Sequence, residues 1–379
     1  PGVGSFNGTP TGPLGQALAP PSCVQADVHN PLWWGCRNVN HYDRLDRLQE
    51  GAYGVVYKAK NKKTGELVAL KKVKMNNRME GFPITALRET NVLLALQHPN
   101  IVGVLEMVVG RELDKVFMVM EYFENDLKQV LTIQKERRRN QLKTHLGADL
   151  GDDQHTQIFM AQEVKCLMLQ ILSAIEYMHR CWYIHRDLKT SNILFNMKGK
   201  LAVCDFGLAR KIGDPIRPYT FNVVTLWYRP PELLMGTREY STAVDMWSIG
   251  CIFAEIMTGD ALFKGTSQTD QIQKIFSIVG KPTPEKWAGY EALPNAKVFK
   301  WRADMRPRLR ELFPCTSQAS FTSTANALSE TGFDLLNRLL HMDPAQRINA
   351  DDALNHAWFQ ESPLATPRAQ MPIFPQGGP

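Results

Sequence analysis

Three oxygen-bearing side chains near the middle of the chain could hold metal ions and orient a hydroxyl group for attack on phosphate. Asp187 and Asn192 lie five residues apart in the stretch HRDLKTSN, and Asp205 opens the stretch DFG. Carboxylate and amide oxygens are the ligands that Mg²⁺ prefers, and an aspartate can accept the proton of a substrate hydroxyl. Their types and spacing therefore indicate a site for phosphoryl transfer.

A short β-hairpin is predicted between these residues. Its strands would be the runs 193–195 and 199–204, which are separated by a polar turn. Because a hairpin brings the chain back to its starting point, we expect Asp205 to lie beside Asp187 and Asn192. Each motif alone occurs by chance in unrelated chains, whereas their order and spacing together are informative.

A glycine-containing turn and a lysine on the next predicted strand could bind a nucleotide. Gly51 and Gly54, in the stretch EGAYG, would let backbone amides approach phosphate oxygens, although an ordinary hairpin turn is the alternative. The following strand LVALK places Ala69 and Lys71 on one face, because side chains alternate along a strand. A small residue beside a lysine suits an adenine ring lying next to its own phosphates.

An acidic partner for this lysine is expected on the next helix. The helix PITALRE would begin at Pro83, because proline is favoured in the first turn. It carries Glu89, which could pair with Lys71 and hold it toward the α- and β-phosphates. A solvated lysine is the alternative. Two further predicted strands, 101–109 and 116–122, would complete a small sheet.

The second half of the chain is predicted to be mainly helical. One helix carries apolar residues at helical spacing, and we interpret this stripe as core; its members are Val164, Leu167, Met168, Ile171, Ile175 and Met178. Residues 132–158 depart from such a pattern and are expected to form an insertion. Its basic run KERRR (135–139) is interpreted as an exposed loop, with a nuclear-import signal or a phosphate-binding patch as alternatives.

Composition places the chain among globular proteins. It has 379 residues, 44% of them hydrophobic and 22% charged, which allows two lobes. The net charge of +6 is scattered along the chain, so direct binding of nucleic acid is not expected. Seven cysteines without a Cys-x-x-Cys pair argue against a disulfide framework and a zinc site. No apolar run reaches the ~20 residues that span a bilayer, so no membrane segment is expected.

With these residues in place, the chain resembles the cyclin-dependent protein kinases, most closely the PITSLRE branch associated with transcription and pre-mRNA splicing. The resemblance covers roughly residues 35–375 and rests on GCRNV, PITALRE, HRDLKTSN and YSTAVDMW. It implies an α+β, bilobal kinase fold with a small β-rich lobe and a larger helical lobe. The expected organisation is a flexible leader (1–35), a kinase domain (36–361) with an N-lobe (42–122) and a C-lobe (123–361) that contains the insertion (about 132–158), and a Pro-rich tail (362–379).

The resemblance also implies roles for individual residues. Asp187 would face the substrate hydroxyl with help from Lys189 and Thr225, while Asn192 and Asp205 would hold Mg²⁺. The implied activating ion pair is Lys71 with Glu89. The implied ATP-binding set is Leu48, Gly51, Gly54, Val56, Ala69, Lys71, Met120, Glu121, Phe123, Asp126, Leu194 and Asp205.

Regulatory residues are implied in the same way. Thr220 would be an activating phosphorylation site, whose phosphate could bind Arg88, Arg186 and Arg210 through charge-assisted hydrogen bonds. Tyr53 would be an inhibitory phosphorylation site. It is the one such site left in this turn, because Ala52 replaces the inhibitory threonine that many relatives carry. Two further implied features involve residues elsewhere: a pocket that prefers proline after the target residue, shaped by Val223, Val224 and Arg229, and a pair between Glu232 and Arg347.

The implied partners are a cyclin, of the L-type or alternatively the T-type, and proteins with Ser/Thr-Pro sites. The cyclin would bind through the helix 83–89, and the expected location is the nucleus, with the cytoplasm as an additional location. A kinase of the same group that needs no cyclin and a pseudokinase scaffold are the rival hypotheses. Phe221 and Asn222 follow Thr220, where a mitogen-activated type would carry a Thr-x-Tyr pair.

Overall fold

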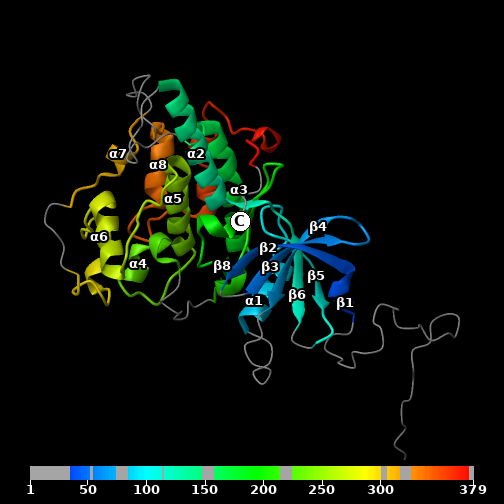
Figure 1. Cartoon of the computed structure of the whole chain (residues 1–379). Coiled ribbons are helices and arrows are strands. Elements are labelled where there is room, and N and C mark those ends of the chain that lie inside the picture. The colour runs from blue at the N-terminus through cyan, green and yellow to red at the C-terminus, as the bar shows by residue number, and fades with distance from the viewer. Residues whose placement is uncertain are drawn as a thin grey trace, which may run out of the picture. The chain divides into compact units, whose positions relative to one another are not determined.

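A computed structural model of the chain gives the fold (Figure 1). The residues it describes are 35–51, 54–73, 84–112, 115–146, 158–213, 224–299, 305–315 and 326–374. The chain divides into two compact units, Pro1–Pro83 with Val104–Tyr122 and Ile84–Gly103 with Phe123–Pro379. No described helix is both long and apolar enough to cross a bilayer.

The smaller unit is a six-stranded sheet. Its strands are β1 (Arg37–Asn38), β2 (Tyr42–Gly51), β3 (Gly54–Asn61), β4 (Leu67–Val73), β5 (Val104–Val109) and β6 (Val116–Glu121). Their order is β1-β5-β6-β4-β3-β2, and all neighbours are antiparallel except β1 and β5. The strands expected from the sequence are confirmed, although β5 begins at Val104. Ile101, where that strand was expected to start, instead bridges to Val203 in the larger unit.

One face of this sheet is closed by apolar residues that alternate along its strands, as a half-buried sheet requires. The buried cluster contains Val39, Tyr42, Ala59, Val68, Leu70, Val108, Phe117 and Val119. A polar contact fastens β1 to the edge of the sheet. Arg37 Nε donates to Glu106 Oε2 at 2.8 Å, and Tyr42 Oη donates to the other carboxylate oxygen. The stretch GCRNV therefore adds a strand to the domain.

The larger unit is mainly helical. Its helices are α1 (Ile84–Ala95), α2 (Leu127–Leu146), α3 (Ala161–Arg180), α4 (Pro231–Leu234), α5 (Ala243–Thr258), α6 (Gln268–Val279), α7 (Leu309–Leu312), α8 (Glu330–Leu339) and α9 (Ala350–Leu354). Every member of the predicted apolar stripe on α3 is fully buried, which confirms it as core. Short strands accompany the helices: β7 (Asn125–Asp126), β8 (Tyr183–Ile184), β9 (Ile193–Phe195), β10 (Leu201–Val203) and β11 (Arg210–Lys211).

Helix α1 groups with the larger unit, whereas the sequence placed it in the N-lobe 42–122. The physical reason is its packing on the 3₁₀ turn Phe206–Leu208, which follows Asp205. The helix begins at Ile84, and Pro83, its predicted first residue, lies outside the described residues.

The expectation of an exposed loop over 135–139 is wrong. Helix α2 continues through the basic run to Leu146. The helix is held because Leu127, Val130 and Leu131 are buried on one side of it. Two of the basic residues also have partners in the same unit, since Lys135 forms an ion pair with Asp260 and Arg137 lies over the ring of Phe374.

The Pro-rich segment after residue 361 is packed against the larger unit as far as Phe374. Met371 and Phe374 are buried within it, and the backbone N–H of Thr366 donates to the carbonyl of Gln162 on α3 at 3.0 Å. The sequence placed the end of the domain near 361 because prolines return there. A composition rule of this kind does not register the two apolar anchors, Met371 and Phe374.

The predicted pair between Glu232 and Arg347 is confirmed. The guanidinium binds both carboxylate oxygens, at 2.7 and 2.9 Å, and neither side chain is exposed by more than 3%. Arg347 also donates to the carbonyls of Ala243, His341 and Met342, so its remaining donors are satisfied. A buried bidentate pair with all its hydrogen bonds made fixes the relative position of the segments that carry it.

Candidate active site

A buried carboxylate holds the loop that carries the predicted catalytic residues. Asp245, on α5, accepts backbone N–H groups from both His185 and Arg186 at 2.9 Å, and it also contacts His179 Nε2 at 2.9 Å. Arg186 adopts a left-handed backbone conformation with φ of 68°, which few residues other than glycine occupy. The two hydrogen bonds to Asp245 stabilise this sharp turn just before Asp187.

The pKa of Asp245 reflects this environment. Burial acts to raise it, but the hydrogen bond and charge of His179, the charge of His185 and the N–H of Arg186 outweigh burial. The pKa is therefore lowered, and the carboxylate remains ionised within the core.

Four of the predicted catalytic residues form one closed network around Asp187. Lys189 Nζ donates to Asp187 Oδ2 at 2.8 Å, and Thr225 donates to Oδ1 through its hydroxyl at 2.8 Å and its backbone N–H at 3.1 Å. Lys189 Nζ also reaches Thr225 Oγ1 at 3.2 Å. The amide of Asn192 donates to the carbonyl of Asp187 at 2.8 Å and to its Oδ2 at 3.2 Å. The carboxylate of Asp187 is thus fixed in direction.

The predicted hairpin, formed by β9 and β10, brings Asp205 back beside this network. The strands pair in register from Ile193 with Val203 to Phe195 with Leu201. At the end of the hairpin, the N–H of Cys204 donates to the carbonyl of Asn192 at 2.9 Å, and His185 Nε2 contacts the carbonyl of Cys204 at 3.0 Å. Asp205 follows directly, in a left-handed conformation with φ of 63°.

These residues suit a hard divalent cation. The nitrogen of the Asn192 amide is occupied by Asp187, which leaves the amide oxygen as the atom that can bind a metal. Asp205 directly follows Cys204, whose N–H binds the carbonyl of Asn192. Carboxylate and amide oxygens are the ligands that Mg²⁺ prefers. Asn192 and Asp205 are therefore the residues that would hold Mg²⁺.

The predicted nucleotide-binding residues divide between the two units. In the larger unit, Asp126 and Leu194 are paired neighbours on β7 and β9, and the buried ring of Phe123 lies under the ammonium of Lys200. Asp126 also caps α2, since its Oδ1 accepts the N–H of Gln129 at 2.8 Å. Burial, partly offset by hydrogen bonds from backbone N–H groups, raises the pKa of Asp126.

In the smaller unit, the sheet register gathers the other nucleotide residues. Lys71 pairs with Val56 on one side, and Ala69 pairs with Met120 on the other. Gly54 lies so close to the carbonyl of Lys72 that a Cβ atom would overlap it, so only glycine fits there. Three further members of the set, Leu48, Gly51 and Glu121, lie on β2 and β6.

Glu89, the predicted partner of Lys71, is buried on α1 in the larger unit. Because Lys71 belongs to the smaller unit, the ion pair between them stays a prediction. Tyr53, Thr220 and Val223 lie outside the described residues.

The three arginines expected around a phosphate lie close together in the larger unit. Each binds the carbonyl of one of three consecutive residues after Phe206: Arg88 donates to Gly207 (3.3 Å), Arg186 to Leu208 (2.8 Å) and Arg210 to Ala209 (3.2 Å). Burial, together with the nearby charge of Arg186, lowers the pKa of Arg88. The arrangement concentrates positive charge beside the start of the segment that leads to Thr220.

Known proteins match this chain over nearly its whole length. The family model described as "Protein kinase domain" matches residues 42–359. Cyclin-dependent kinase G-2 of Oryza sativa subsp. japonica is 52% identical over 341 residues, which are 90% of this chain and 44% of that protein. Cyclin-dependent kinase 11B is 46% identical in Rattus norvegicus, over 91% of this chain and 72% of that protein.

The chain belongs to the cyclin-dependent protein kinases. The resemblance to this family found in the sequence is confirmed, as is the kinase fold, and a kinase domain binds ATP. The mouse form of kinase 11B is 47% identical, again over 91% of this chain. This chain spans only 44% of the rice relative and 40% of the mouse relative.

Sequence reasoning missed a buried network behind the catalytic loop of the kinase. Thr190 Oγ1 donates to Glu255 Oε1 at 3.1 Å, and Tyr228 Oη donates to Glu255 Oε2 at 2.7 Å. Burial raises the pKa of Glu255, against the lowering effect of both hydrogen bonds, and burial also raises that of Tyr228. The network joins Lys189-Thr190 to the segment after Thr225. Its only signal in the sequence is that the apolar helix α5 carries a second acidic residue, Glu255, in addition to Asp245.

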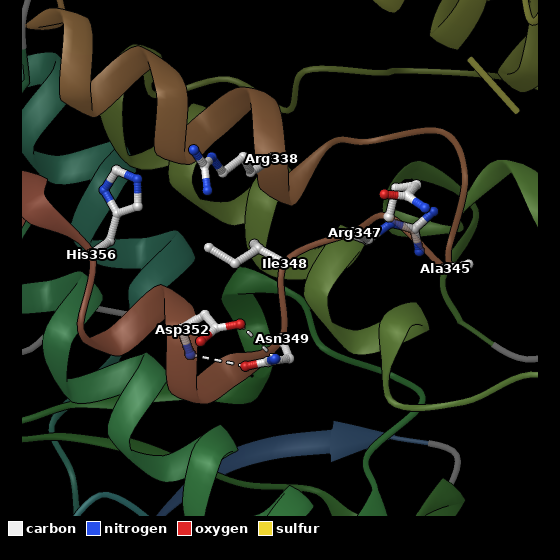
Figure 2. Close-up of a pocket in the computed structure, with 8 residues that line it drawn as sticks. Arg338, Ala345, Arg347, Ile348, Asn349, Asp352 and His356 are labelled. Carbon is white, nitrogen blue, oxygen red and sulfur yellow. Dashed lines mark hydrogen bonds between the residues drawn. The ribbon is translucent and has the colours of Figure 1, made fainter. Parts of the chain in front are cut away.

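A surface pocket in the larger unit is built from residues of α8, α9, the loop between them and His356, which follows α9 (Figure 2). Several of its polar groups have partners within the larger unit. Arg338 and His356 both contact Asp334, at 2.8 and 3.1 Å, and Asn349 Nδ2 donates to the carboxylate of Asp352 at 2.7 Å. Its lining contains none of the predicted catalytic or nucleotide-binding residues.

Replacing Asp245 with asparagine should destabilise the kinase by about 2–4 kcal/mol at neutral pH, because buried N–H groups lose their charged acceptor. The lowered pKa means that the stabilisation by Asp245 is complete above the ordinary aspartate range. It is lost as pH falls through the folded-state value. Denaturant unfolding of both proteins across pH measures this.

The stability difference should therefore shrink toward acid pH. The exposed Asp46→Asn serves as a control that should leave stability nearly unchanged. A difference that stays constant down to strongly acid pH would contradict the role given to the Asp245 charge.

Proposed function

We propose that this chain is a cyclin-dependent serine/threonine kinase that transfers the γ-phosphoryl group of Mg-ATP to Ser or Thr. The observation that carries the proposal is the closed hydrogen-bond network in which Lys189, Asn192 and Thr225 fix the carboxylate of Asp187. The chain's membership of the cyclin-dependent kinases supports it.

In this proposal, Asp187 orients the substrate hydroxyl and accepts its proton. Phosphoryl transfer requires little covalent chemistry from the protein, so fixed geometry and charge supply most of the acceleration. Lys189 places an ammonium group beside Asp187 at the reacting end of the site, where negative charge develops on the transferring group. Mg²⁺, held by Asn192 and Asp205, would neutralise part of that charge.

The same site favours proline after the target residue. Val224 adopts a left-handed conformation with φ of 67°, and its carbonyl is occupied by Arg229, whose Nη2 donates to it at 2.8 Å. A residue with an N–H at that position of a substrate finds no acceptor in Val224, whereas proline has no N–H to satisfy. Equal turnover of Ser-Pro and Ser-Ala peptides would contradict this preference.

A cyclin is the proposed activating partner, bound by the exposed face of α1. Ile84, Leu87 and Leu94 lie on one side of this helix, and they are 72%, 46% and 57% exposed. The opposite side buries Glu89, so a protein bound on the apolar face would fix the helix that carries it. An L-type cyclin is the first choice, on the resemblance to the PITSLRE branch, and a T-type cyclin is the alternative.

We also propose a nuclear role in transcription or splicing control, with the cytoplasm as an additional location. The support is the resemblance to the PITSLRE branch. The basic run 135–139 adds little to it, because Lys135 binds Asp260 and Arg137 binds the carbonyl of Ile373. Imaging of the tagged chain in cells tests the location, and exclusion from the nucleus would contradict it.

Asp187→Asn should reduce phosphorylation of a Ser-Pro peptide by about 10²- to 10⁴-fold, because the general base is lost. Binding of Mg-ATP should be nearly unchanged. Radiolabelled phosphate transfer, measured with and without L-type and T-type cyclins, provides the comparison, and Asp46→Asn is the control. Activity of the unaltered chain without any cyclin would favour a cyclin-independent kinase, and binding of Mg-ATP without activity in any mixture would favour a scaffold.

Thr220→Ala should lower the cyclin-stimulated activity, because a phosphate at Thr220 could no longer bind Arg88, Arg186 and Arg210 through charge-assisted hydrogen bonds. Phosphatase treatment of the unaltered chain should produce the same loss. Full activity of a chain that mass spectrometry finds unmodified at Thr220 would remove this residue as the switch.

Leu87→Asp should weaken cyclin binding by at least about 30-fold, because it places a charge at the centre of the apolar face of α1. Calorimetric titration with a purified cyclin measures the effect. Val298→Asp is the matched control, since Val298 is also exposed, at 71%, but lies outside α1. Undiminished binding by the Leu87 variant would show that the cyclin docks elsewhere.

A further inference from the structure

The C-terminal segment 362–374 is fastened to the larger unit at several points along its length. Lys165, buried on α3, donates from Nζ to the carbonyls of Glu361 and Pro363, both at 2.8 Å. Further along, the N–H of Thr366 donates to the carbonyl of Gln162 at 3.0 Å. Figure 1 shows this segment in red beside α2 and α3.

The turn between β9 and β10 is shaped to let the segment pass. Gly199 has φ of +69°, and a Cβ atom there would overlap the carbonyl of Arg368. Only glycine permits both the left-handed turn and this close approach of two backbones. The hairpin that separates Asn192 from Asp205 therefore has a glycine at the point where the C-terminal segment crosses it.

The described part of the segment ends in a buried aromatic residue. Phe374 is 1% exposed, and its ring packs edge-on against Phe159 and Phe195, with ring centroids 6.1 and 5.7 Å apart. Edge-to-face pairs at these distances are favourable beyond the burial of their area. Phe374 therefore joins Phe159 to Phe195, which lies on β9.

Polar groups hold the backbone on either side of this ring. Asn125 Nδ2, itself buried, donates to the carbonyl of Phe374 at 3.3 Å, and Arg137 Nη1 donates to the carbonyl of Ile373 at 3.2 Å. The guanidinium of Arg137 also lies 5.3 Å from the centre of the Phe374 ring, a cation–π contact. Part of the basic run in α2 thus serves to hold the C-terminal segment.

Phe374 contacts one face of the two-stranded ribbon formed by β7 and β9. The other face of this ribbon carries two residues of the proposed ATP site, Asp126 and Leu194. On this ribbon, Asn125 pairs with Phe195, and Asp126 pairs with Leu194. Because side chains alternate along strands, the two pairs point to opposite faces. Phe374 packs on the first pair, and the second pair belongs to the part of the proposed ATP site that the larger unit provides.

We propose that Phe374 is a positioning residue for nucleotide binding, which holds the β7–β9 ribbon so that Asp126 and Leu194 present a fixed surface to ATP. The inference rests on the proposed function, since it takes these two residues as part of the ATP site. Phe374 contacts Phe159, Phe195, Asn125 and Arg137, none of which belongs to the network around Asp187. Its loss should therefore change the affinity for ATP more than the rate of phosphoryl transfer.

The test measures binding of ATP to the full chain by calorimetry with excess Mg²⁺, which needs neither a cyclin nor turnover. Phe374→Ala leaves a space between Phe159 and Phe195, and the affinity for ATP should fall by about tenfold. Phe374→Leu, which refills most of that space, should restore most of the affinity. Ile373→Ala is the matched control, because Ile373 is adjacent in sequence and 63% exposed.

Kinetics with a cyclin separate positioning from simple loss of folded protein. The KM for ATP should rise in Phe374→Ala, while kcat and the KM for the peptide stay within about twofold of the unaltered chain. A fall in kcat with an unchanged KM for ATP would overturn the inference. Partial unfolding produces this pattern, because it lowers the amount of active enzyme and leaves the affinity of the remaining folded enzyme unchanged.

If Phe374→Ala fails to unfold cooperatively on heating, Arg137→Ala provides the test without creating a cavity. We then expect a loss of affinity for ATP of about threefold, because the anchor of the segment is weakened. Unchanged affinity in the folded variants overturns the role of Phe374 and leaves the proposed function intact. Failure of the unaltered chain to bind Mg-ATP would overturn both.

Discussion

The geometry of the catalytic loop depends on one buried carboxylate. Asp245 binds the N–H groups of two consecutive residues, His185 and Arg186, and the second of these has a left-handed backbone. Without a charged acceptor, this turn would leave two buried donors unsatisfied and a strained residue unsupported. Everything that the loop positions, including the carboxylate of Asp187, therefore depends on a side chain that takes no part in the chemistry.

Other buried polar groups extend the same arrangement. Glu255 joins Thr190 to Tyr228, and Arg347 joins Glu232 to the carbonyl of Ala243. Each links segments that are far apart in the sequence. Charged groups in a core are costly unless fully paired, but paired groups allow few alternative arrangements. In this kinase they lie where loops must be held in one conformation, while the regular helices are held mainly by apolar packing.

The C-terminal segment 362–374 is also held to the catalytic domain by contacts between residues that are far apart in the sequence. Its prolines and exposed side chains give it the composition of a linker, yet Lys165, Gly199 and Asn125 meet its backbone at three places. Two of these contacts lie on the strands and turn around β9, which begins directly after Asn192. The segment 362–374 is thus coupled to the hairpin that separates the two proposed metal-binding residues, Asn192 and Asp205.

The sequence by itself determined the family, the residues around Asp187, the hairpin that returns Asp205 and the strands of the sheet. These features depend on short spacings and on alternation or helical periodicity, which act within a few residues of the chain. Only the tertiary structure decided that α2 continues through residues 135–139, that Glu255 supports the loop behind Thr190, and that Phe374 packs on Phe195. In each case the deciding partner lies far away in the sequence, so local propensity and composition contain no record of it.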